Sequence, residues 1–206
     1  MARNRDPFTQ ALSALRDRIQ SGAIPGGAPV IVVDEAERLG LSTTPVREAL
    51  ARLSGEGLVV RAAPGGYFAM PFDASDVSER YAMRGQYLRM AVEISVARLG
   101  ALTRPAPRFD DDAPESSVHR LFRRLVIDTG NAFLGRSYDH LAGQLSRTRL
   151  VETRLFANLR AEGETLFDAY SHRPATDFLD SMGDYHQRRL DAAATLASML
   201  NDPEGD

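Results

Sequence analysis

Residues 39–53 read LGLSTTPVREALARL, and this stretch decides the fold of the N-terminal third of the chain. Gly40 supplies the permissive backbone that a short turn between two helices needs. Thr44 can cap the following helix through its hydroxyl, and Pro45 suits the first helical position, where no amide donor is required. The sequence therefore predicts a helix, a tight turn and a second helix that begins at Pro45.

The second helix has one apolar face and a polar leading turn. Its apolar positions recur at helical spacing, at Val46, Ala49, Leu50 and Leu53. The same spacing leaves polar side chains on the first turn and its outer face, at Thr43, Thr44, Arg47 and Glu48. Such a turn can meet the base edges and phosphates of a duplex, so this pair of helices is typical of a DNA-binding helix-turn-helix.

A hairpin is expected directly after the second helix. Gly57 is predicted to end that helix, and two apolar runs follow at residues 58–62 and 67–70. Pro64-Gly65-Gly66 lies between the runs and favours a turn, so the two runs are predicted to pair as a wing.

A first helix is predicted upstream of the turn. One apolar stripe marks it, formed by Phe8, Leu12, Leu15 and Ile19, and residues 22–29 break it. Residues 30–33 are a β-branched run that taken alone indicates a strand, whereas residues 34–39 indicate a helix.

Together these motifs closely resemble the winged helix-turn-helix of the GntR family of bacterial transcription regulators. The most specific string is TPVREAL at residues 44–50, and residues 15–26, LRDRIQSGAIPG, match a first helix that ends in a Gly-x-Ile/Leu-x-Pro-Gly turn. The resemblance covers roughly residues 8–72, and it implies that residues 1–72 form a DNA-binding domain. The family has a short extended piece and then a helix at residues 30–39, which accommodates both local signals.

Arg47 is the strongest candidate for contact with DNA, because its place on the first turn points a forked cation at the major groove or its phosphates. The alternative is a surface arginine paired with Glu48 or Glu56. Hydroxyl groups near the turn can donate to phosphate, and Gly66 allows the wing a close approach. The predicted DNA-contacting set is Ser42, Thr43, Thr44, Arg47, Arg52 and Gly66.

Two features of this surface lower the affinity for DNA that we expect. Thr43 stands where relatives usually place arginine, and the wing has Pro64-Gly65 where theirs is often basic. Residues 1–72 hold eight arginines against seven acidic residues, so few phosphates can be neutralised. We therefore expect modest non-specific affinity and a homodimer that reads two half-sites.

Composition sets the outer limits of the fold. A chain of 206 residues with 43% apolar content can form two modest domains, and without cysteine it forms neither disulfides nor a thiolate zinc site. The N-terminus leads into an amphipathic helix, and no run approaches the ~18 apolar residues of a membrane span. A cytoplasmic protein without membrane contact is expected. All 25 basic residues are arginine, from which no function follows.

The second domain, residues 73–206, is predicted to be an all-helical antiparallel bundle, so the whole chain is mainly α. A linker and cap at residues 73–76 precede a long helix marked by Val77, Tyr81, Leu88, Val92 and Leu99. Residues 100–117 contain three prolines and an acidic run, which indicates a loop. The remaining helices are predicted near residues 116–129, 132–160, 162–171 and 175–200.

A weaker resemblance extends into this half. The strings YAMR at 81–84, TGN at 129–131 and DA at 168–169 look like landmarks of the FCD domain of the FadR-like branch. That domain implies dimerisation and a small carboxylate effector, often held through a divalent metal on one aspartate and three histidines. The positions that match those ligands carry Val118, Phe122, Gly163 and either Tyr185 or, with a one-residue slip, His186. At most one ligand survives, so no metal cofactor is expected.

This FCD-like domain is also expected to be shortened and divergent, because the stretch between Leu99 and Val118 is too short for the usual pair of helices. No two histidines have the i, i+4 spacing of a helical metal site, and all four are expected at the surface or its boundary. The acidic run at residues 110–112 lacks the glycine and alternating ligands of a calcium loop, so it is expected to be solvated.

Arg84 is the leading candidate for an effector contact, because the family often turns this position inward to meet the ligand carboxylate. A buried arginine needs an anion, so an inward Arg84 implies an acidic ligand or an internal carboxylate such as Glu93. The alternative is a solvent-facing Arg84. The secondary candidates are Tyr81, Asn131, Arg149 and Tyr185.

These observations predict a DNA-binding transcriptional regulator, by default a repressor, whose hold on operator DNA is modulated by a small organic acid. An enzyme is the first rival, but the sequence has neither a Gly-x-Ser-x-Gly elbow nor a His-Glu-x-x-His motif, so no catalytic residues are assigned. The second rival is a protein-interaction or small-molecule-sensing module with little DNA binding, which the weakly basic wing allows.

Overall fold

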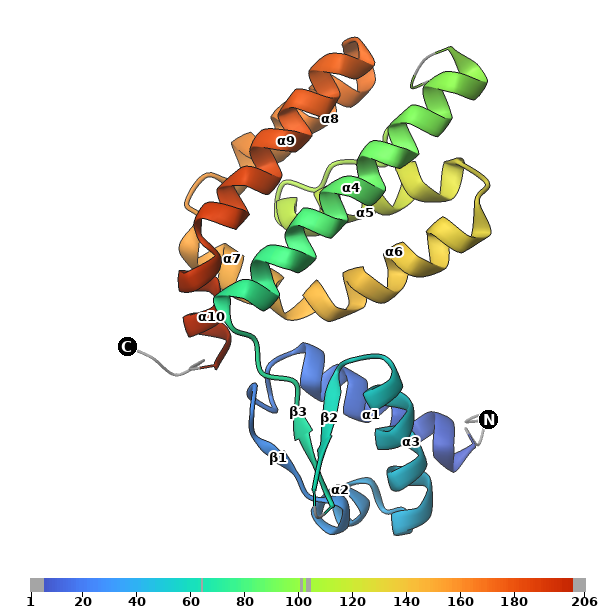
Figure 1. Ribbon diagram of the computed structural model, residues 1–206, viewed down its shortest axis with the longest axis vertical. Helices are drawn as coiled ribbons and strands as arrows, with labels where there is room; N and C mark the ends of the chain where they lie inside the picture. Colours follow the sequence, from blue (N-terminus) through green and yellow to red (C-terminus); the bar gives the residue numbers. More distant parts are fainter. Residues whose placement is uncertain (1–5, 64, 101, 103–104, 202–206) are drawn as a thin grey trace.

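The computed structural model describes residues 6–63, 65–100, 102 and 105–201, and it has an N-terminal domain beneath a larger helical domain (Figure 1). The N-terminal domain comprises α1 (Pro7–Gln20), β1 (Pro29–Val30), α2 (Val32–Leu39), α3 (Thr43–Gly55), β2 (Val59–Ala62) and β3 (Gly66–Ala69). Three helices and a small wing were predicted here, and both are confirmed.

The sheet of the N-terminal domain is antiparallel in the order β1-β3-β2. Tyr67 on β3 stands opposite Val30 on one side and Arg61 on the other. The short β1 and the helix α2 that follows it confirm the mixed signal of residues 30–39. The apolar faces of α1 and α3 pack together beneath the sheet, with Leu15, Leu50 and Leu53 fully buried. This core holds α3 with its polar side turned outward.

Helix α3 begins earlier than the sequence predicted. Its N-cap is Ser42, which makes no side-chain capping bond, and Thr43 is its first residue. The expectation that Thr44 caps the helix and that Pro45 starts it was therefore wrong. Pro45 lies at the third helical position, where the amide still has no acceptor within the helix, so proline costs the helix nothing there. The first turn consequently contains both threonines.

Gly57 ends α3 as predicted. Its φ of 71° is in the left-handed region that favours glycine, and the Leu58 amide donates to the Leu53 carbonyl at 3.0 Å. Gly40 has the corresponding role at the end of α2, with φ 65°. These two glycines set the turn before α3 and the turn after it. Pro64, which was predicted in the wing turn, lies outside the described residues.

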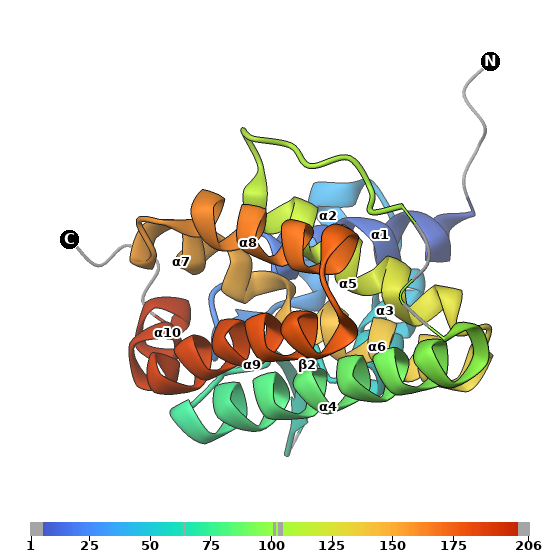
Figure 2. The same cartoon turned by 90° about the horizontal axis from the view of Figure 1, so that it is seen from above.

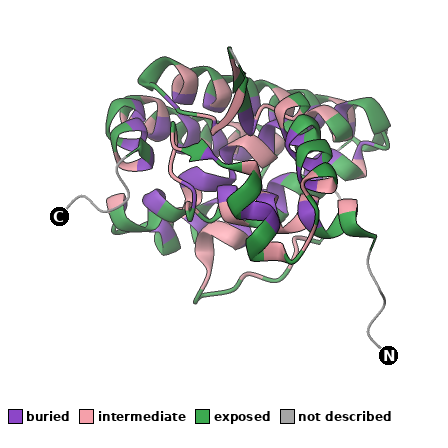
Figure 3. Ribbon diagram, turned by 90° about the horizontal axis from the view of Figure 1, so that it is seen from below, coloured by how far each residue is buried: buried purple, intermediate pink, exposed green. Residues whose placement is uncertain are grey.

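The helical domain comprises α4 (Ala74–Leu99), α5 (Pro114–Asp128), α6 (Ala132–Gln144), the short η1 (Leu145–Arg147), α7 (Thr148–Leu155), α8 (Leu159–His172), α9 (Ala175–Asp191) and α10 (Ala193–Asn201). Helices α4 and α9 lie side by side along the domain, with α5, α6 and α8 behind them (Figures 1 and 2). Their apolar faces form the interior, and the outward faces are largely exposed (Figure 3).

Several predicted helix boundaries in this domain were wrong. Helix α5 begins at Pro114 rather than near 116, because proline fits the first turn of a helix. The helix predicted over 132–160 is divided into α6, η1 and α7, and the segment predicted over 175–200 is interrupted at Ala192. In the predicted loop the described residues before α5 form no helix or strand, while residues 101, 103 and 104 lie outside the description.

Side-chain hydrogen bonds join the two domains, among them one from Gln20 of α1 to the Gly143 carbonyl of α6 at 3.4 Å. The Gln144 amide donates to the Glu56 carbonyl at 3.1 Å and accepts from Arg80 at 3.1 Å. Arg147 donates to the Met70 carbonyl at 3.0 Å, and Asn201 bonds both backbone groups of Phe72. The end of α3 and the linker are thus held by groups from the helical domain. Within the described part of the chain, no helix is both long and apolar enough to cross a membrane.

We predict that Gly57→Ala destabilises the protein by about 1–2 kcal/mol, because a side chain at positive φ is strained. A Cβ there would also lie 2.5 Å from the Gln144 amide nitrogen. Gly55→Ala is the matched control, since a Cβ at that position meets nothing within 4 Å and alanine favours a helix. Urea denaturation followed by circular dichroism measures both changes. Equal stability of the two variants would contradict this account of the helix end.

Candidate functional site

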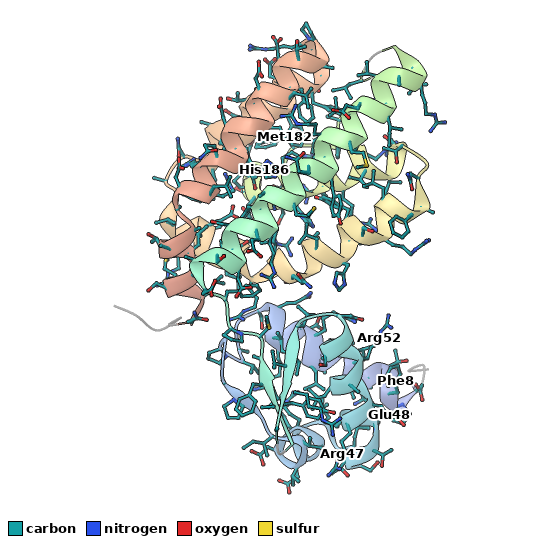
Figure 4. The ribbon with its side chains drawn as sticks, in the orientation of Figure 1. Phe8, Arg47, Glu48, Arg52, Met182 and His186 are labelled. Carbon is teal, nitrogen blue, oxygen red and sulfur yellow. The ribbon has the colours of Figure 1, made fainter. Side chains whose placement is uncertain are left out.

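A groove is lined by the start of α3, by the wing, and by β1 with the start of α2. Arg47 of α3, Arg61 of β2 and Gly66 of β3 line it, and its volume is about 480 Å³. Arg47 is exposed and lies at the end of the molecule farthest from the helical domain (Figure 4). The groove thus has two arginine side chains, and Gly65 and Gly66 beside them leave the backbone uncovered.

The guanidinium of Arg47 is free to bind a ligand. It makes no ion pair or hydrogen bond with any other described residue, and the carboxylate of Glu56 is already occupied. Glu56 pairs with Arg16 at 2.7 Å and with Arg52 at 3.0 Å. The alternative in which Glu56 neutralises Arg47 is therefore wrong.

The structure brings only part of the predicted DNA-contacting set together. Ser42 and Thr44 are exposed around the start of α3, and Thr43 is half-buried. Gly66 lines the same groove as Arg47. Arg52 instead lines a second hollow, between α3 and α6, near the other end of the helix (Figure 4).

Sequence reasoning missed Arg61, which stands in the wing beside Arg47. The residue lies in the first apolar run of the hairpin and is exposed, although alternation places it on the same face of β2 as buried Val59. Its charge within the otherwise apolar run of residues 59–62 is the signal that would have found it. The wing therefore carries a basic residue, although its turn has none.

The helical domain contains a buried arginine without a carboxylate partner. Arg84 is 4% exposed, and its Nε donates to Nε2 of His186 at 3.2 Å. Aromatic rings surround the guanidinium, with Tyr81 at 4.6 Å and Tyr185 at 5.4 Å from ring centre to charge. Its Nη2 is buried and has no hydrogen-bond partner among the described residues.

The inward orientation of Arg84 answers one question that the sequence left open. The alternative of a solvent-facing Arg84 was wrong. Glu93, which was considered as the internal counter-ion, is exposed and forms no ion pair with Arg84. The charge of Arg84 is therefore not balanced by a direct contact with any described carboxylate.

The other predicted effector residues are in three different situations. The Tyr81 hydroxyl donates to the Glu152 carboxylate and lies 2.6 Å from the Thr148 hydroxyl, so that group is already engaged. Tyr185 lies beneath the Arg189 guanidinium, 3.3 Å from the ring centre. Arg149 is half-buried.

Asn131 is exposed and caps α6 by accepting from the Leu134 amide at 3.0 Å. It therefore does not belong with the residues around Arg84.

Sequence reasoning also missed Tyr138, which is fully buried on α6 and whose hydroxyl has no hydrogen-bond partner among the described residues. Desolvation raises its pKa above the ordinary value, and the positive charge of Arg84 partly offsets that rise. Tyr138 recurs at helical spacing with Leu134 and Leu141 of α6, but periodicity does not reveal that a hydroxyl lacks a partner.

Arg189 lies in the same core and, unlike Arg84, forms ion pairs with carboxylates. It is 0% exposed, and its Nη2 lies 2.9 Å from Glu152 and 2.8 Å from Glu162. Its Nη1 also donates to the Tyr185 carbonyl at 2.9 Å. This network joins α7, α8 and α9 and leaves the guanidinium with a carboxylate on two sides.

The residues at the metal-ligand positions implied by the resemblance do not fit a divalent ion. Phe122 stacks on His186 with ring centres 5.7 Å apart. A Cβ on Gly163 would lie 2.8 Å from the Phe109 ring and 3.4 Å from Val118. These positions do converge, but carbon atoms fill the space between them. No group of three or more histidine, aspartate or glutamate side chains suited to a metal occurs among the described residues.

One histidine differs from the expectation that all four lie at the surface or its boundary. His186 is a core residue, 6% exposed, and its Nδ1 donates to the Met182 carbonyl at 2.7 Å. Burial, together with the positive charge of Arg84, holds the pKa of His186 well below its usual value. Burial and the charges of Arg149 and Arg84 lower the pKa of half-buried His119 to about 3. His140 and His172 are exposed, as expected.

A three-helix domain with a β-wing, whose second turn-forming helix offers an unpaired arginine to solvent, is a winged helix-turn-helix DNA-binding domain. Residues 8–68 match the family model for bacterial regulatory proteins of the gntR family. The N-terminal domain is therefore of the gntR type.

Two curated relatives agree with this assignment. The chain is 35% identical over 71 residues to an uncharacterized HTH-type transcriptional regulator in the TAR-I ttuE-ttuC' intergenic region of Agrobacterium vitis. It is 35% identical over 72 residues to the Nta operon transcriptional regulator of Aminobacter aminovorans. These matches cover 34% and 35% of this chain, and the chain spans only 42% and 34% of the relatives' lengths. About a third of the chain is thus similar in sequence to two transcriptional regulators.

Solved structures extend the similarity in fold to the helical domain. E. coli McbR/YncC matches with a TM-score of 0.68 at 20% identity, over 92% of this chain and 98% of that one. A regulator described as GntR from Rhodococcus sp. RHA1 matches with a TM-score of 0.65 at 18% identity, over 93% and 97% of the two chains. The arrangement of a winged domain and a helical domain is thus shared.

We predict that the protein loses stability as the pH falls below about 6.5, where exposed histidines of the unfolded chain bind protons. His119 and His186 stay neutral in the fold, so the unfolded state binds more protons and the free energy of unfolding falls toward acid pH. The slope is up to about 1.4 kcal/mol per pH unit for each histidine.

Urea denaturation at several pH values between about 5 and 7 measures this slope. His119→Gln and His186→Gln should each flatten it, whereas His172→Gln, which changes an exposed histidine, should not. A slope unchanged in both buried-site variants would show that other groups cause the pH dependence.

Proposed function

We propose that this chain acts in the cytoplasm as a homodimeric, DNA-binding transcriptional regulator, by default a repressor, that responds to a small organic acid. The observation that carries the DNA-binding part is the unpaired Arg47 guanidinium beside the wing groove. A forked cation at the leading end of an exposed helix can bond a guanine edge or a phosphate in the major groove. The matches of the winged domain to regulators support this assignment.

The remaining contacts follow from the position of each group. Ser42, Thr43 and Thr44 are placed to donate hydroxyl hydrogen bonds to phosphates at the start of α3, and Gly66 lets the wing backbone approach. Arg61 would add a phosphate contact from the wing. Arg52 would contribute less, because it pairs with Glu56 and lies toward the helical domain.

For the helical domain we propose a divergent, shortened FCD domain of the FadR-like branch that binds the effector. The landmarks YAMR, TGN and DA support this, and so does the buried charge of Arg84, which an acidic effector would balance. Tyr81, Tyr185 and Arg149 would surround such a ligand, and Asn131 would support the start of α6 instead. The ligand changes DNA binding only if it prefers one arrangement of the two winged domains over another.

The alternative is a sensing or protein-interaction module that binds little DNA. The N-terminal domain carries almost no net positive charge, which favours this alternative. A gel-shift series on the upstream DNA of its own gene, with salt varied, distinguishes the two. A regulator gives a sequence-specific shift that weakens as salt rises, whereas the alternative gives no specific shift.

We predict that Arg47→Ala weakens specific DNA binding by about 10- to 100-fold, because a buried bidentate contact to a base contributes roughly 1–3 kcal/mol. Arg136→Ala is the matched control, since it removes the same charge from the exposed side of α6 and should leave affinity nearly unchanged. Arg52→Ala should have an intermediate or small effect. Fluorescence anisotropy with operator and scrambled duplexes measures the losses. Unchanged specific affinity in Arg47→Ala would overturn this docking.

We also predict that the free protein is a dimer in sedimentation equilibrium. Apolar side chains on α4 and α6 are unusually exposed, with Met83 at 48%, Met90 at 45% and Phe133 at 74%. We expect the double variant Met83→Glu/Met90→Glu to sediment as a monomer, because it would bury charge in an interface. Ser171→Glu, which adds charge at the exposed end of α8, should stay dimeric. A monomeric wild-type protein would contradict the dimer.

A further inference from the structure

We propose that the hollow between α3 and α6 binds a small phosphate monoester, which would join the winged domain to the helical domain. The hollow has a volume of about 480 Å³. Residues of α1 and of the C-terminal end of α3 form one wall, and residues of α6 form the other. The helix α6 is the part of the helical domain that lies next to the winged domain (Figure 1). A ligand held by both walls would therefore fix how the two domains lie.

Each wall carries an arginine with unused donor groups. Arg136 of α6 is exposed and makes no ion pair or hydrogen bond with any other described residue. Arg52 of α3 has one partner among the described residues, Glu56, at 3.0 Å from its Nε, and 65% of its side chain is exposed. Like charges on opposite walls repel each other, and an anion between them would remove that repulsion.

The carboxylates of the hollow do not balance these charges. Glu56 already accepts two hydrogen bonds from Arg16, at 2.7 and 2.9 Å, before its pairing with Arg52 is counted. Asp139 on the α6 wall is engaged by Arg123 of α5, at 2.8 and 3.1 Å. The hollow and its edge thus have four guanidinium groups and two carboxylates, which leaves an excess of two positive charges.

The wall formed by α6 also offers a neutral donor. The amide of Gln144 has a defined orientation, because its Oε1 accepts from Arg80 and its Nε2 donates to the Glu56 carbonyl, both at 3.1 Å. The same Nε2 lies 3.1 Å from Nε2 of His140. An amide nitrogen only donates, so the imidazole accepts there and, when neutral, carries its proton on Nδ1. His140 lines the hollow and therefore keeps an N–H group for a ligand.

The excess charge and the donors select the class of ligand. A phosphate monoester carries nearly two negative charges at neutral pH and has three terminal oxygens. Those oxygens can accept from guanidinium groups on more than one side, whereas a carboxylate presents two oxygens in one plane. The volume of the hollow is within the range of small-molecule sites, so an organic group fits beside the phosphate. We therefore expect a phosphorylated small molecule rather than free phosphate.

DNA phosphates are the competing partner for these charges. Arg47 lies at the end of the molecule farthest from the helical domain, whereas Arg52 lies toward that domain (Figure 4). A duplex against the start of α3 would be separated from α6 by the body of the winged domain. The hollow is therefore distinct from the surface proposed to bind DNA. Its effect on DNA binding rests on the proposed regulator function, but the binding of the ligand does not.

The experiment is isothermal titration calorimetry of the whole chain with glycerol 3-phosphate in a phosphate-free buffer. Inorganic phosphate and glycerol are titrated in the same way at equal ionic strength. We expect saturable binding of glycerol 3-phosphate, weaker binding of inorganic phosphate and no binding of glycerol. The absence of saturable binding of glycerol 3-phosphate would overturn the proposal, and so would tighter binding of inorganic phosphate than of the monoester.

Variants assign the binding to the two walls. Arg52→Gln and Arg136→Gln should each weaken it by about tenfold or more, because each removes a charged hydrogen-bond donor. The two losses should not add in the double variant, because both arginines hold one ligand. Arg89→Gln is the matched control, since Arg89 is an exposed arginine of α4 that does not line the hollow. Circular dichroism checks that every variant is folded.

Two results with these variants would refute the site. One is a wall variant that binds glycerol 3-phosphate as tightly as Arg89→Gln does. The other is an equal loss of succinate binding and of glycerol 3-phosphate binding in Arg136→Gln, because the hollow would then select any dianion rather than a phosphate.

The failure of this proposal can be told apart from the failure of the proposed regulator function. Arg47→Ala should lose specific DNA binding and keep glycerol 3-phosphate binding, whereas Arg136→Gln should do the opposite in phosphate-free buffer. A wild-type protein that binds the monoester but no specific DNA would support the hollow and contradict the regulator. Weaker DNA binding by Arg136→Gln, with no monoester binding by the wild-type protein, would show that the hollow faces DNA and would overturn this proposal alone.

Discussion

The hydrogen bond from Gln144 to the Glu56 carbonyl fixes the end of α3 to the helical domain. Helix α3 ends at Gly55, and its last free carbonyl groups need donors from outside the helix. The helical domain supplies one of them through Gln144, whose position also excludes a side chain at Gly57. The end of α3 opposite Arg47 is thereby fixed to the domain that is proposed to sense the ligand.

Two buried arginines in the helical domain differ in how their charges are paired. Arg189 is enclosed by Glu152 and Glu162, and such a network fixes α7, α8 and α9 against one another. Arg84 is enclosed by rings and one imidazole, and its Nη2 has no hydrogen-bond partner among the described residues. A fully satisfied network resists change, whereas an unsatisfied group gains free energy from a ligand that supplies the missing hydrogen bond.

The sequence predicted the winged domain in detail because each of its elements has a local cause, such as Gly40, Gly57 and the apolar stripe of α3. It missed the start of α3, because a proline is tolerated at several positions of a first turn. In the helical domain the breaks at η1 and Ala192 were missed, since tertiary packing sets them. The spacing of Leu134, Tyr138 and Leu141 is typical of one helix face, but only three-dimensional packing shows that the Tyr138 hydroxyl has no partner among the described residues.

Helix α6 would give a physical route between the proposed effector site and the DNA-binding surface. It packs against α4, which carries Arg84, and Gln144 at its end holds the end of α3. An effector bound at Arg84 would affect α3 by this route if it changed the position of α6. Because α6 is one element, a modest difference in ligand affinity between two positions of α6 would then bias where Arg47 is held.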